Sequence, residues 1–161
     1  ATELGAALRR LLLGAEFTVG ARAEALLMAA DRAEHVAQVV APALARGAWV
    51  VSDRFVGSSL AYQGGARGLG FEEVAALNRF ATAGIEPDVV VYLAAPIATL
   101  RARRGGLGDR FEREGEGFVA AVARAYDQLA AELGWVVVDA TPDEDAVEAA
   151  VWAAVERALA P

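Results

Sequence analysis

Cysteine and lysine are both missing from this chain of 161 residues, and histidine occurs once, as His35. Without cysteine, neither a disulfide framework nor a thiolate site is possible. A single histidine excludes a metal site built from several imidazoles. No uncharged apolar run reaches the length of about 18 residues that suggests a transmembrane helix, and no signal peptide precedes the fold. We therefore expect a soluble, cytoplasmic domain with no membrane partner.

The charge balance is acidic. Fifteen basic residues, all of them arginine, stand against 22 acidic residues, which leaves a net charge of −7. A surplus of negative charge repels a phosphate backbone, so the composition argues against nucleic acid as a general partner. The length suits one domain that can bury a sizeable core.

Short apolar runs alternate with amphipathic segments along the chain. The apolar runs predict strands at 49–52, 89–93 and 135–138. The run at 89–93 is almost wholly apolar, which is typical of a parallel sheet covered on both faces. Helical spacing predicts helices at 2–13, 21–41, 71–83, 96–104, 118–133 and 141–158. This alternation indicates an α/β fold with a parallel sheet.

Two of the predicted helices carry more detailed expectations. The helix at 71–83 should bury one stripe formed by Val74, Leu77 and Phe80. The last helix should begin at Thr141, whose hydroxyl suits an N-cap.

The stretch from 49 to 70 is where we expect the chemistry. Asp53 and Arg54 follow the first predicted strand, and ligands bind at the carboxyl ends of strands in open α/β sheets. Arginine presents a planar fork of donors that matches a phosphate group. A loop rich in polar side chains is predicted after this pair. A surface ion pair followed by an ordinary loop would give the same pattern.

A second group of arginines lies in the glycine-bearing stretch 101–116. Arg101, Arg104 and Arg110 belong to it. Phosphoryl transfer needs positive charge around the phosphoryl oxygens, and a segment that closes on a ligand excludes water. A solvated charge cluster on an exposed loop is the alternative interpretation.

Four motifs, in order along the chain, resemble those of thymidylate kinase, a P-loop nucleoside monophosphate kinase. They are LLMAADRAEHV (26–36), SDRFVGSSLAYQGGARGLG (52–70), the arginine-bearing stretch 101–112 and Val138-Asp139-Ala140. The resemblance implies a P-loop NTPase-type parallel sheet flanked by helices. It also implies transfer of a phosphoryl group from ATP to dTMP.

The resemblance assigns roles to the acceptor-side residues. Arg54 matches the arginine that holds the acceptor's 5′-phosphate, and Asp53 the carboxylate near the transferring phosphoryl group. Arg32 matches the arginine that hydrogen-bonds the thymine ring. Met28 stands where the family usually has a phenylalanine stacked on that ring. Ordinary core packing is the other interpretation of Met28.

The remaining assignments follow the same resemblance. Ser59 falls where relatives carry a polar residue that reaches the base. Its neighbour Ser58 is also expected to bind the substrate. Tyr62 falls where an aromatic ring closes under the deoxyribose and would crowd a 2′-hydroxyl. Gln63 is expected beside the base or the phosphate. On the ATP side the expected residues are Arg110, Asp139 and Ala140. The stretch 101–116 is expected to be the lid over the nucleotide, and its arginines are expected to be catalytic together with Asp53 and Arg54, with Arg110 as the first choice and Arg101 and Arg104 after it.

The resemblance further implies ATP and Mg²⁺, the metal lying near Asp53 through water or phosphates, and a homodimer formed through the 21–41 helix. The family's N-terminal strand–loop–helix–strand portion, with its G-x-x-x-x-G-K-[ST] loop, has no match in these residues. We therefore expect residues 1–161 to be an N-terminally incomplete thymidylate kinase domain that does not transfer phosphoryl groups alone. A non-catalytic nucleotide-binding or dimerising relative, and a kinase of another deoxynucleoside or nucleoside monophosphate, are the alternatives.

Overall fold

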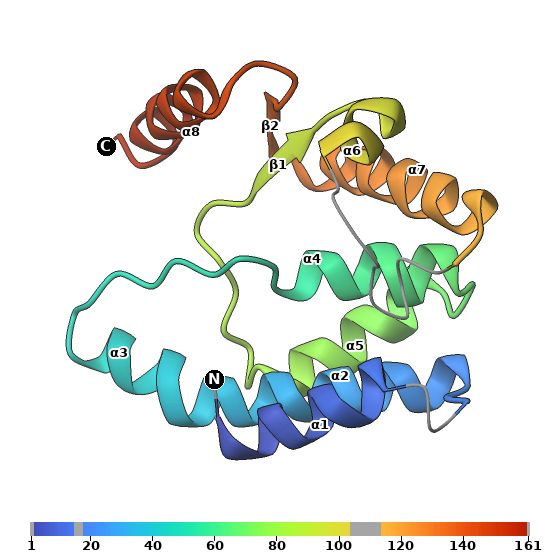
Figure 1. Cartoon of the computed structure of the whole chain (residues 1–161). Helices are drawn as coiled ribbons and strands as arrows, with labels where there is room; N and C mark the ends of the chain where they lie inside the picture. Colours follow the sequence, from blue (N-terminus) through green and yellow to red (C-terminus); the bar gives the residue numbers. More distant parts are fainter. Residues whose placement is uncertain (1, 15–17, 104–113, 161) are drawn as a thin grey trace.

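The structure is a computed structural model that describes residues 2–14, 18–103 and 114–160. Helices dominate it, and Figure 1 shows the small sheet at one end and the layered helices α1, α2 and α5 at the other. The elements in chain order are α1 (Glu3–Leu13), α2 (Ala21–His35), the π-helical segment η1 (Val36–Val40), α3 (Ala41–Ala45), α4 (Val56–Ser59), the π-helical segment η2 (Leu60–Ala66), α5 (Phe71–Ala81), β1 (Val91–Ala94), α6 (Ile97–Arg103), α7 (Glu116–Leu133), β2 (Val136–Asp139) and α8 (Glu144–Ala158). Among the described residues, no helix combines the length and apolar character needed to cross a bilayer.

The sheet confirms two of the predicted strands and their parallel pairing. β1 and β2 run parallel, with Val91 opposite Val136 and Ala94 opposite Asp139. The expectation that both faces are covered is wrong for the described residues, because Leu93 and Val137 are about half exposed.

The predicted strand at 49–52 is wrong. Residues 49–51 form an extended segment outside the sheet, in which Trp49 is 80 % exposed and Val51 is 95 % exposed. An apolar run becomes a strand only when a neighbouring strand pairs with its N–H and C=O groups. In the described part of the chain the sheet consists of β1 and β2 alone, so this run has no strand beside it.

The predicted loop after Arg54 is also wrong, because residues 56–66 are helical. Glycines misled the prediction, since here they allow close packing rather than a turn. A Cβ on Gly65 would stand 2.5 Å from the Cβ of Ala125, and one on Gly57 would stand 2.8 Å from the Trp135 ring. The helix made by α4 and η2 can therefore lie tightly against α7 and the start of β2.

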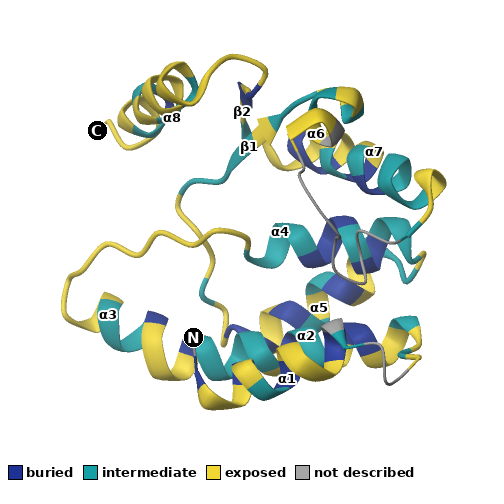
Figure 2. Ribbon diagram, in the orientation of Figure 1, coloured by how far each residue is buried: buried dark blue, intermediate teal, exposed yellow. Residues whose placement is uncertain are grey.

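The core lies where η2, α5 and α7 meet (Figure 2). Its buried members are Leu60, Ala61, Val74, Val122, Ala125 and Leu129. Phe80 does not join it, contrary to the predicted stripe, and is 88 % exposed. The buried stripe of α5 is Val74, Asn78 and Ala81 instead. Steps of three residues drift around a helix by about 60° each time, which turns Phe80 away from Val74.

Side-chain oxygens cap the N-terminal ends of α1 and α8. Thr2 caps α1 by accepting a hydrogen bond from the Gly5 backbone N–H at 2.9 Å. The predicted N-cap at Thr141 is wrong, because Asp143 caps α8 through the Ala146 N–H. The hydroxyl of Thr141 instead donates to Asp139 at 2.9 Å, and an N-cap side chain must accept.

The helix predicted at 21–41 is present as a continuous helical run from α2 through η1 to α3. Pro42 lies in the first turn of α3 and has no N–H to donate. The π-helical segment η1 lies immediately before it, and the Ala41 N–H bonds to the Val36 carbonyl five residues back.

Candidate functional site

Two helical stripes with a four-residue spacing are connected by hydrogen bonds. The stripes are Glu24, Met28 and Arg32 on α2, and Ser59, Gln63 and Arg67 on the run from α4 to the end of η2. Arg32 bonds to Ser59 at one end, and Glu24 bonds to Gln63 and Arg67 at the other. Met28 lies half-buried between these two pairs on the α2 stripe.

Arg32 is held on one side by neutral acceptors. Its Nε donates to Oδ1 of Asn78 and its Nη2 to Oγ of Ser59, both at 2.8 Å. The guanidinium lies 5.1 Å from the centre of the Phe55 ring. Burial lowers the pKa of Arg32, against the opposing charge of Asp31. Arg32 makes no further hydrogen bond to the described residues, so the rest of its donor fork can serve a ligand.

Asn78 was missed by the sequence analysis. It is 1 % exposed, and its Nδ2 donates to the Val74 carbonyl at 2.8 Å, which fixes the side chain with its oxygen toward Arg32. The signal that could have found it is an amide on the buried stripe of an amphipathic helix, because buried polar groups need partners.

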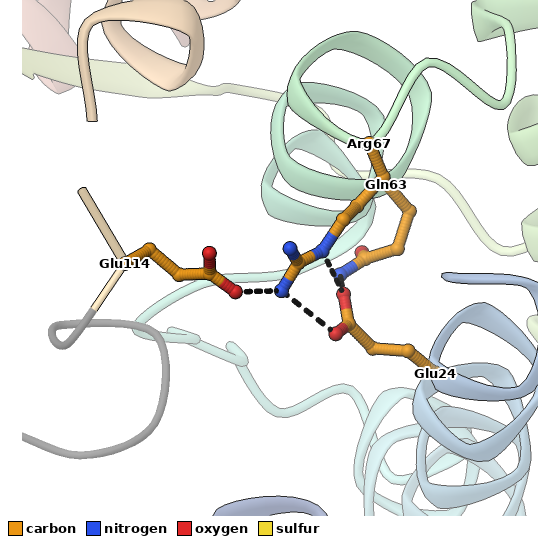
Figure 3. A network of polar contacts seen from close by, with 4 residues as sticks. All are labelled: Glu24, Gln63, Arg67 and Glu114. Atoms are coloured by element: carbon orange, nitrogen blue, oxygen red, sulfur yellow. Dashed lines mark hydrogen bonds and ion pairs between the residues drawn. The ribbon is translucent and has the colours of Figure 1, made fainter. Parts of the chain in front are cut away.

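Glu24 was missed as well, although it is 0 % exposed. Figure 3 shows its carboxylate meeting Gln63 and Arg67. Nε2 of Gln63 donates at 2.9 Å, while Nε and Nη2 of Arg67 donate at 3.2 and 3.1 Å. The structure thus brings Gln63, predicted beside the base or phosphate, to Glu24.

Arg67 carries two ionic partners. Its Nη2 lies 3.1 Å from Glu24 and 2.6 Å from Glu114, and its guanidinium stands 4.4 Å from the centre of the Phe118 ring. Burial acts to lower the pKa of Arg67, but the hydrogen bonds to Glu114 and Glu24 outweigh it and raise that pKa. The charge of Arg67 is therefore neutralised within the protein.

Asp53 and Arg54 lie in a strained turn just before α4. Arg54 has a φ of 69°, a conformation that costs a side chain about 1 kcal/mol or more, and Ser52 Oγ donates to its carbonyl at 2.9 Å. The Arg54 guanidinium is 5.6 Å from the centre of the Tyr62 ring. Partial desolvation acts to lower the pKa of Arg54, but the oxygens of Tyr62 and Tyr126 and the Asp53 carboxylate together outweigh it and raise that pKa. The Asp53 residue is exposed and makes no hydrogen bond to the described residues.

A cluster of tyrosines borders this turn. Ser58 Oγ and the Tyr126 hydroxyl are 2.8 Å apart, and Tyr62 meets Tyr126 edge-on at 6.4 Å. Tyr92 stacks on Tyr126 at 5.3 Å. Burial and the neighbouring Asp127 carboxylate raise the pKa of Tyr92 to about 12. The structure therefore brings Arg54, Ser58 and Tyr62 together, and adds Tyr126 to them.

A separate hollow of about 360 Å³ lies at the end of the sheet. Leu93, Arg103, Ala140, Pro142, Asp143 and Glu144 line it. Arg103 donates to the carbonyls of Ala140, Thr141 and Pro142, the last two at 2.7 Å. Thr141 donates twice to Asp139 at 2.9 Å, and these bonds lower the pKa of Asp139.

Of the predicted ATP-side residues, the structure places Asp139 and Ala140 at this hollow or beside it. Arg104 and Arg110 lie outside the described residues, as does the side chain of Arg101.

Comparison with known proteins decides the family. The sequence model described as thymidylate kinase matches residues 1–151. The thymidylate kinase of Synechococcus sp. (strain WH7803) is 48% identical over 158 residues, which cover 96% of this chain and 74% of that protein. The thymidylate kinase of Synechococcus sp. (strain CC9605) is 43% identical over 162 residues, covering 99% of this chain and 78% of that protein. The chain belongs to the thymidylate kinase family.

Membership in the thymidylate kinase family confirms the resemblance and the α/β fold with its parallel sheet. The match includes every element that carries a predicted site residue, from Met28 on α2 to Ala140 after β2. The family does not by itself assign a role to any single side chain. The roles of the residues in this thymidylate kinase therefore stay predictions.

Proposed function

We propose that the reaction of this thymidylate kinase is phosphorylation of dTMP with ATP as the phosphoryl donor. The observation that carries the proposal is the thymidylate kinase match, which extends over both the polar stripes and the hollow beside β2. The geometry adds Arg32, whose donors are only partly used, and a strained Asp-Arg turn whose next residue, Phe55, lies against the Arg32 guanidinium.

On the acceptor side, Arg32 supplies base recognition. Asn78 and Ser59 accept hydrogen bonds from Nε and Nη2 of the guanidinium, so the remaining N–H groups can donate to a carbonyl oxygen of the thymine ring. Met28 packs against the base, since a thioether suits the face or edge of an aromatic ring. Tyr62 closes under the sugar and leaves little space for a 2′-hydroxyl.

Arg54 and Asp53 act at the phosphates. The Arg54 fork binds the 5′-phosphate of dTMP and orients it for transfer. The family's chemistry implies Mg²⁺, which proteins usually bind through one or two carboxylates together with substrate phosphates. The exposed Asp53 carboxylate fits that donor set, and the described residues contain no cluster of three or more His, Cys, Asp or Glu that would form a cage of their own. When bound, Mg²⁺ neutralises charge on the phosphoryl oxygens.

The nucleotide base of ATP fits the hollow bordered by Ala140 and Pro142. Arg103 fixes the backbone of this wall by its three carbonyl contacts. The arginines at 101, 104 and 110 supply positive charge to the transferring group, with Arg110 as the first choice.

A second copy of this chain pairs through the helical run 21–41. Leu26 and Val39 are exposed there although both are large and apolar. Covering them against a partner removes apolar surface from water. Sedimentation of the wild type and of Leu26→Glu tests this pairing, because a charge on the buried surface of a dimer would yield monomers.

The reaction is tested by coupling ADP formation to NADH oxidation with the full chain as it is encoded. With ATP and Mg²⁺, dTMP should be turned over faster than dUMP, dCMP or UMP. ADP formation that does not depend on dTMP, or a higher kcat/KM for another acceptor, would overturn the proposal.

A further inference from the structure

Glu24 has no part in the reaction proposed above, yet it is the most deeply buried charged side chain described. Its side chain is 0 % exposed, and it lies on the same stripe of α2 as Met28 and Arg32, one turn before the first and two turns before the second. A carboxylate in such a place costs several kcal/mol of desolvation unless partners compensate for it. An apolar side chain would fill the same space without that cost.

The partners of Glu24 come from one face of η2 and the residue that follows it. Arg67 offers two donors at 3.2 and 3.1 Å, one to each carboxylate oxygen, and Gln63 offers a third at 2.9 Å. These bonds run from α2 to a helix whose backbone is irregular, with the Arg67 N–H bonded to the Tyr62 carbonyl five residues back. The directional bonds of Glu24 therefore fix the rotation of η2 about its axis.

That rotation decides where the neighbouring side chains of η2 lie. Tyr62 is the residue before Gln63. Ser59 lies one turn before Gln63 on the same stripe, and its hydroxyl accepts a hydrogen bond from Arg32. A turn of η2 by one residue would move Tyr62 by about 100° and would separate Ser59 from Arg32. Apolar contacts alone permit such sliding, because they have no direction.

The cluster of Glu24, Gln63 and Arg67, here called the anchor, also contacts residues in and just before α7. Arg67 is bonded to Glu114 at 2.6 Å and stands over Phe118 near the start of α7. α7 also carries Tyr126, which bonds to Ser58 and meets Tyr62. Glu24 of α2 and Glu114, two residues before the start of α7, thus meet at the guanidinium of Arg67 (Figure 3).

We infer that Glu24 is a positioning residue of the acceptor site, acting through Gln63 and Arg67 to set the register of η2 against α2. It keeps Arg32 and Tyr62 directed at the same bound nucleotide. This inference rests on the proposed function, since it takes the ligand of this site to be dTMP. It gives a binding role to a carboxylate that does not touch the substrate.

The test measures dTMP and ATP separately in the full chain. Glu24→Ala removes the anchor, and Glu24→Gln keeps an oxygen for Gln63 but loses the charge that Arg67 needs. The matched control is Glu34→Gln on the same helix, whose carboxylate accepts a surface hydrogen bond from Gln38 and no other bond from the described residues. Calorimetric titration with dTMP alone gives Kd without any phosphoryl transfer. Coupled assays give KM for each substrate, and thermal melts give stability.

We expect Glu24→Ala to raise Kd and KM for dTMP about tenfold and Glu24→Gln about threefold, as couplings between contacting residues usually do. KM for ATP should stay within about twofold, because the anchor does not touch the hollow beside β2. Glu34→Gln should match the wild type. A dTMP affinity that is unchanged in both Glu24 variants, with only the melting temperature lowered, would overturn the inference.

A double variant keeps the test decisive if Glu24→Ala does not fold. Glu24→Gln with Arg67→Met removes both charges of the anchor and leaves a neutral pair between positions 24 and 63, while Glu114, which is partly exposed, loses its bond to Arg67. If Glu24 acts through Arg67, this variant should bind dTMP no more weakly than Arg67→Met alone. A strictly additive loss would contradict action through Arg67. Failure of the wild type to bind dTMP would instead overturn the proposed function itself.

Discussion

Arg32 and Arg67 both lie between α2 and the helix at 56–67, and both stack on an aromatic ring, Phe55 for the first and Phe118 for the second. Their hydrogen-bond partners differ in charge. Arg67 meets two carboxylates, whereas Arg32 meets an amide oxygen and a hydroxyl. The pKa of Arg67 is raised by its carboxylates, and the pKa of Arg32 is lowered by burial.

This difference separates a structural cation from one that can bind a ligand. A guanidinium paired with carboxylates has little attraction left for another acceptor, and its removal leaves those carboxylates unpaired. A guanidinium held by neutral groups keeps its charge and part of its donor fork for a ligand. The charge of the protein partners, rather than the depth of burial, therefore indicates which arginine binds substrate.

Arg54 extends the comparison to a third arginine and should give the largest effect. It is exposed and leans on the Tyr62 ring without a carboxylate bonded to it among the described residues. Arg54→Ala should lower kcat/KM for dTMP about a thousandfold, or ~4 kcal/mol of transition-state stabilisation, because a charge-assisted contact to phosphate is lost. Steady-state kinetics measure this, with the exposed Arg46→Ala as the control. A wild-type kcat/KM would refute the assignment.

Removing each of the two compared guanidiniums should affect stability very differently. Arg67→Met should lower the free energy of unfolding by about 3 kcal/mol, since it removes the ion pair and two hydrogen bonds that Arg67 makes to the buried Glu24 carboxylate. Arg32→Met should cost less, about 1 to 2 kcal/mol, because the buried acceptors that lose their donor, in Asn78 and Ser59, are neutral. Urea titrations followed by circular dichroism give both values. Equal losses would mean that the charge of the partners does not separate the two arginines.

Substrate binding should show the reverse order. Arg32→Ala should raise KM for dTMP about thirtyfold, or ~2 kcal/mol, through loss of a hydrogen bond from a charged donor to the base. KM for ATP should change by less than about threefold, since Arg32 belongs to the acceptor side. An equal rise in both KM values would place Arg32 in a general structural role.

Asn78→Asp converts the surroundings of Arg32 into those of Arg67. The added carboxylate should neutralise the guanidinium, and KM for dTMP should rise about fivefold while Arg32 itself is unchanged. The gain of an ion pair is offset by loss of the Nδ2 bond to Val74, so the unfolding free energy should move by about 1 kcal/mol or less. Tighter dTMP binding by this variant would contradict the idea that the neutral partner matters.

Met28 lies between the two arginine sites and should give the smallest effect. Met28→Phe restores the ring usual in the family, and dTMP affinity should increase by up to about threefold or stay unchanged. Isothermal titration with dTMP checks this. A clear weakening would show that the Met28 side chain packs in the core instead.

The sequence predicted those parts of the fold that depend on local pattern. β1, β2 and the amphipathic helices follow from periodicity and apolar runs, and the motif around Arg54 indicated the family. The strand predicted at 49–52 was wrong because a strand forms only beside a neighbouring strand. The composition of the run does not show whether such a neighbour is present. The prediction for residues 56–66 was wrong because polar side chains and glycine are typical of a loop, whereas here Gly57 and Gly65 serve close contacts with distant residues in the packing of a helix.

The two site residues that the sequence did not predict were missed for a different reason. Glu24 and Asn78 have the polar character of surface residues, and their burial follows from partners 39 and 46 positions away in the chain. Pairing of this kind requires knowledge of which helices pack together and in which register. The four-residue spacing of the polar side chains on both helices was visible, but the matching of one stripe to the other was not.

The close approach of Trp135 to Gly57 gives the protein its own optical probe. Of the three tryptophans, Trp49 and Trp152 are exposed, while Trp135 is half-buried with its ring against α4 and Tyr126. Replacing the two exposed indoles by phenylalanine would leave a single emitter beside the acceptor-side helix. Its emission wavelength and quenching would then follow nucleotide arrival in real time, without any label attached to the site.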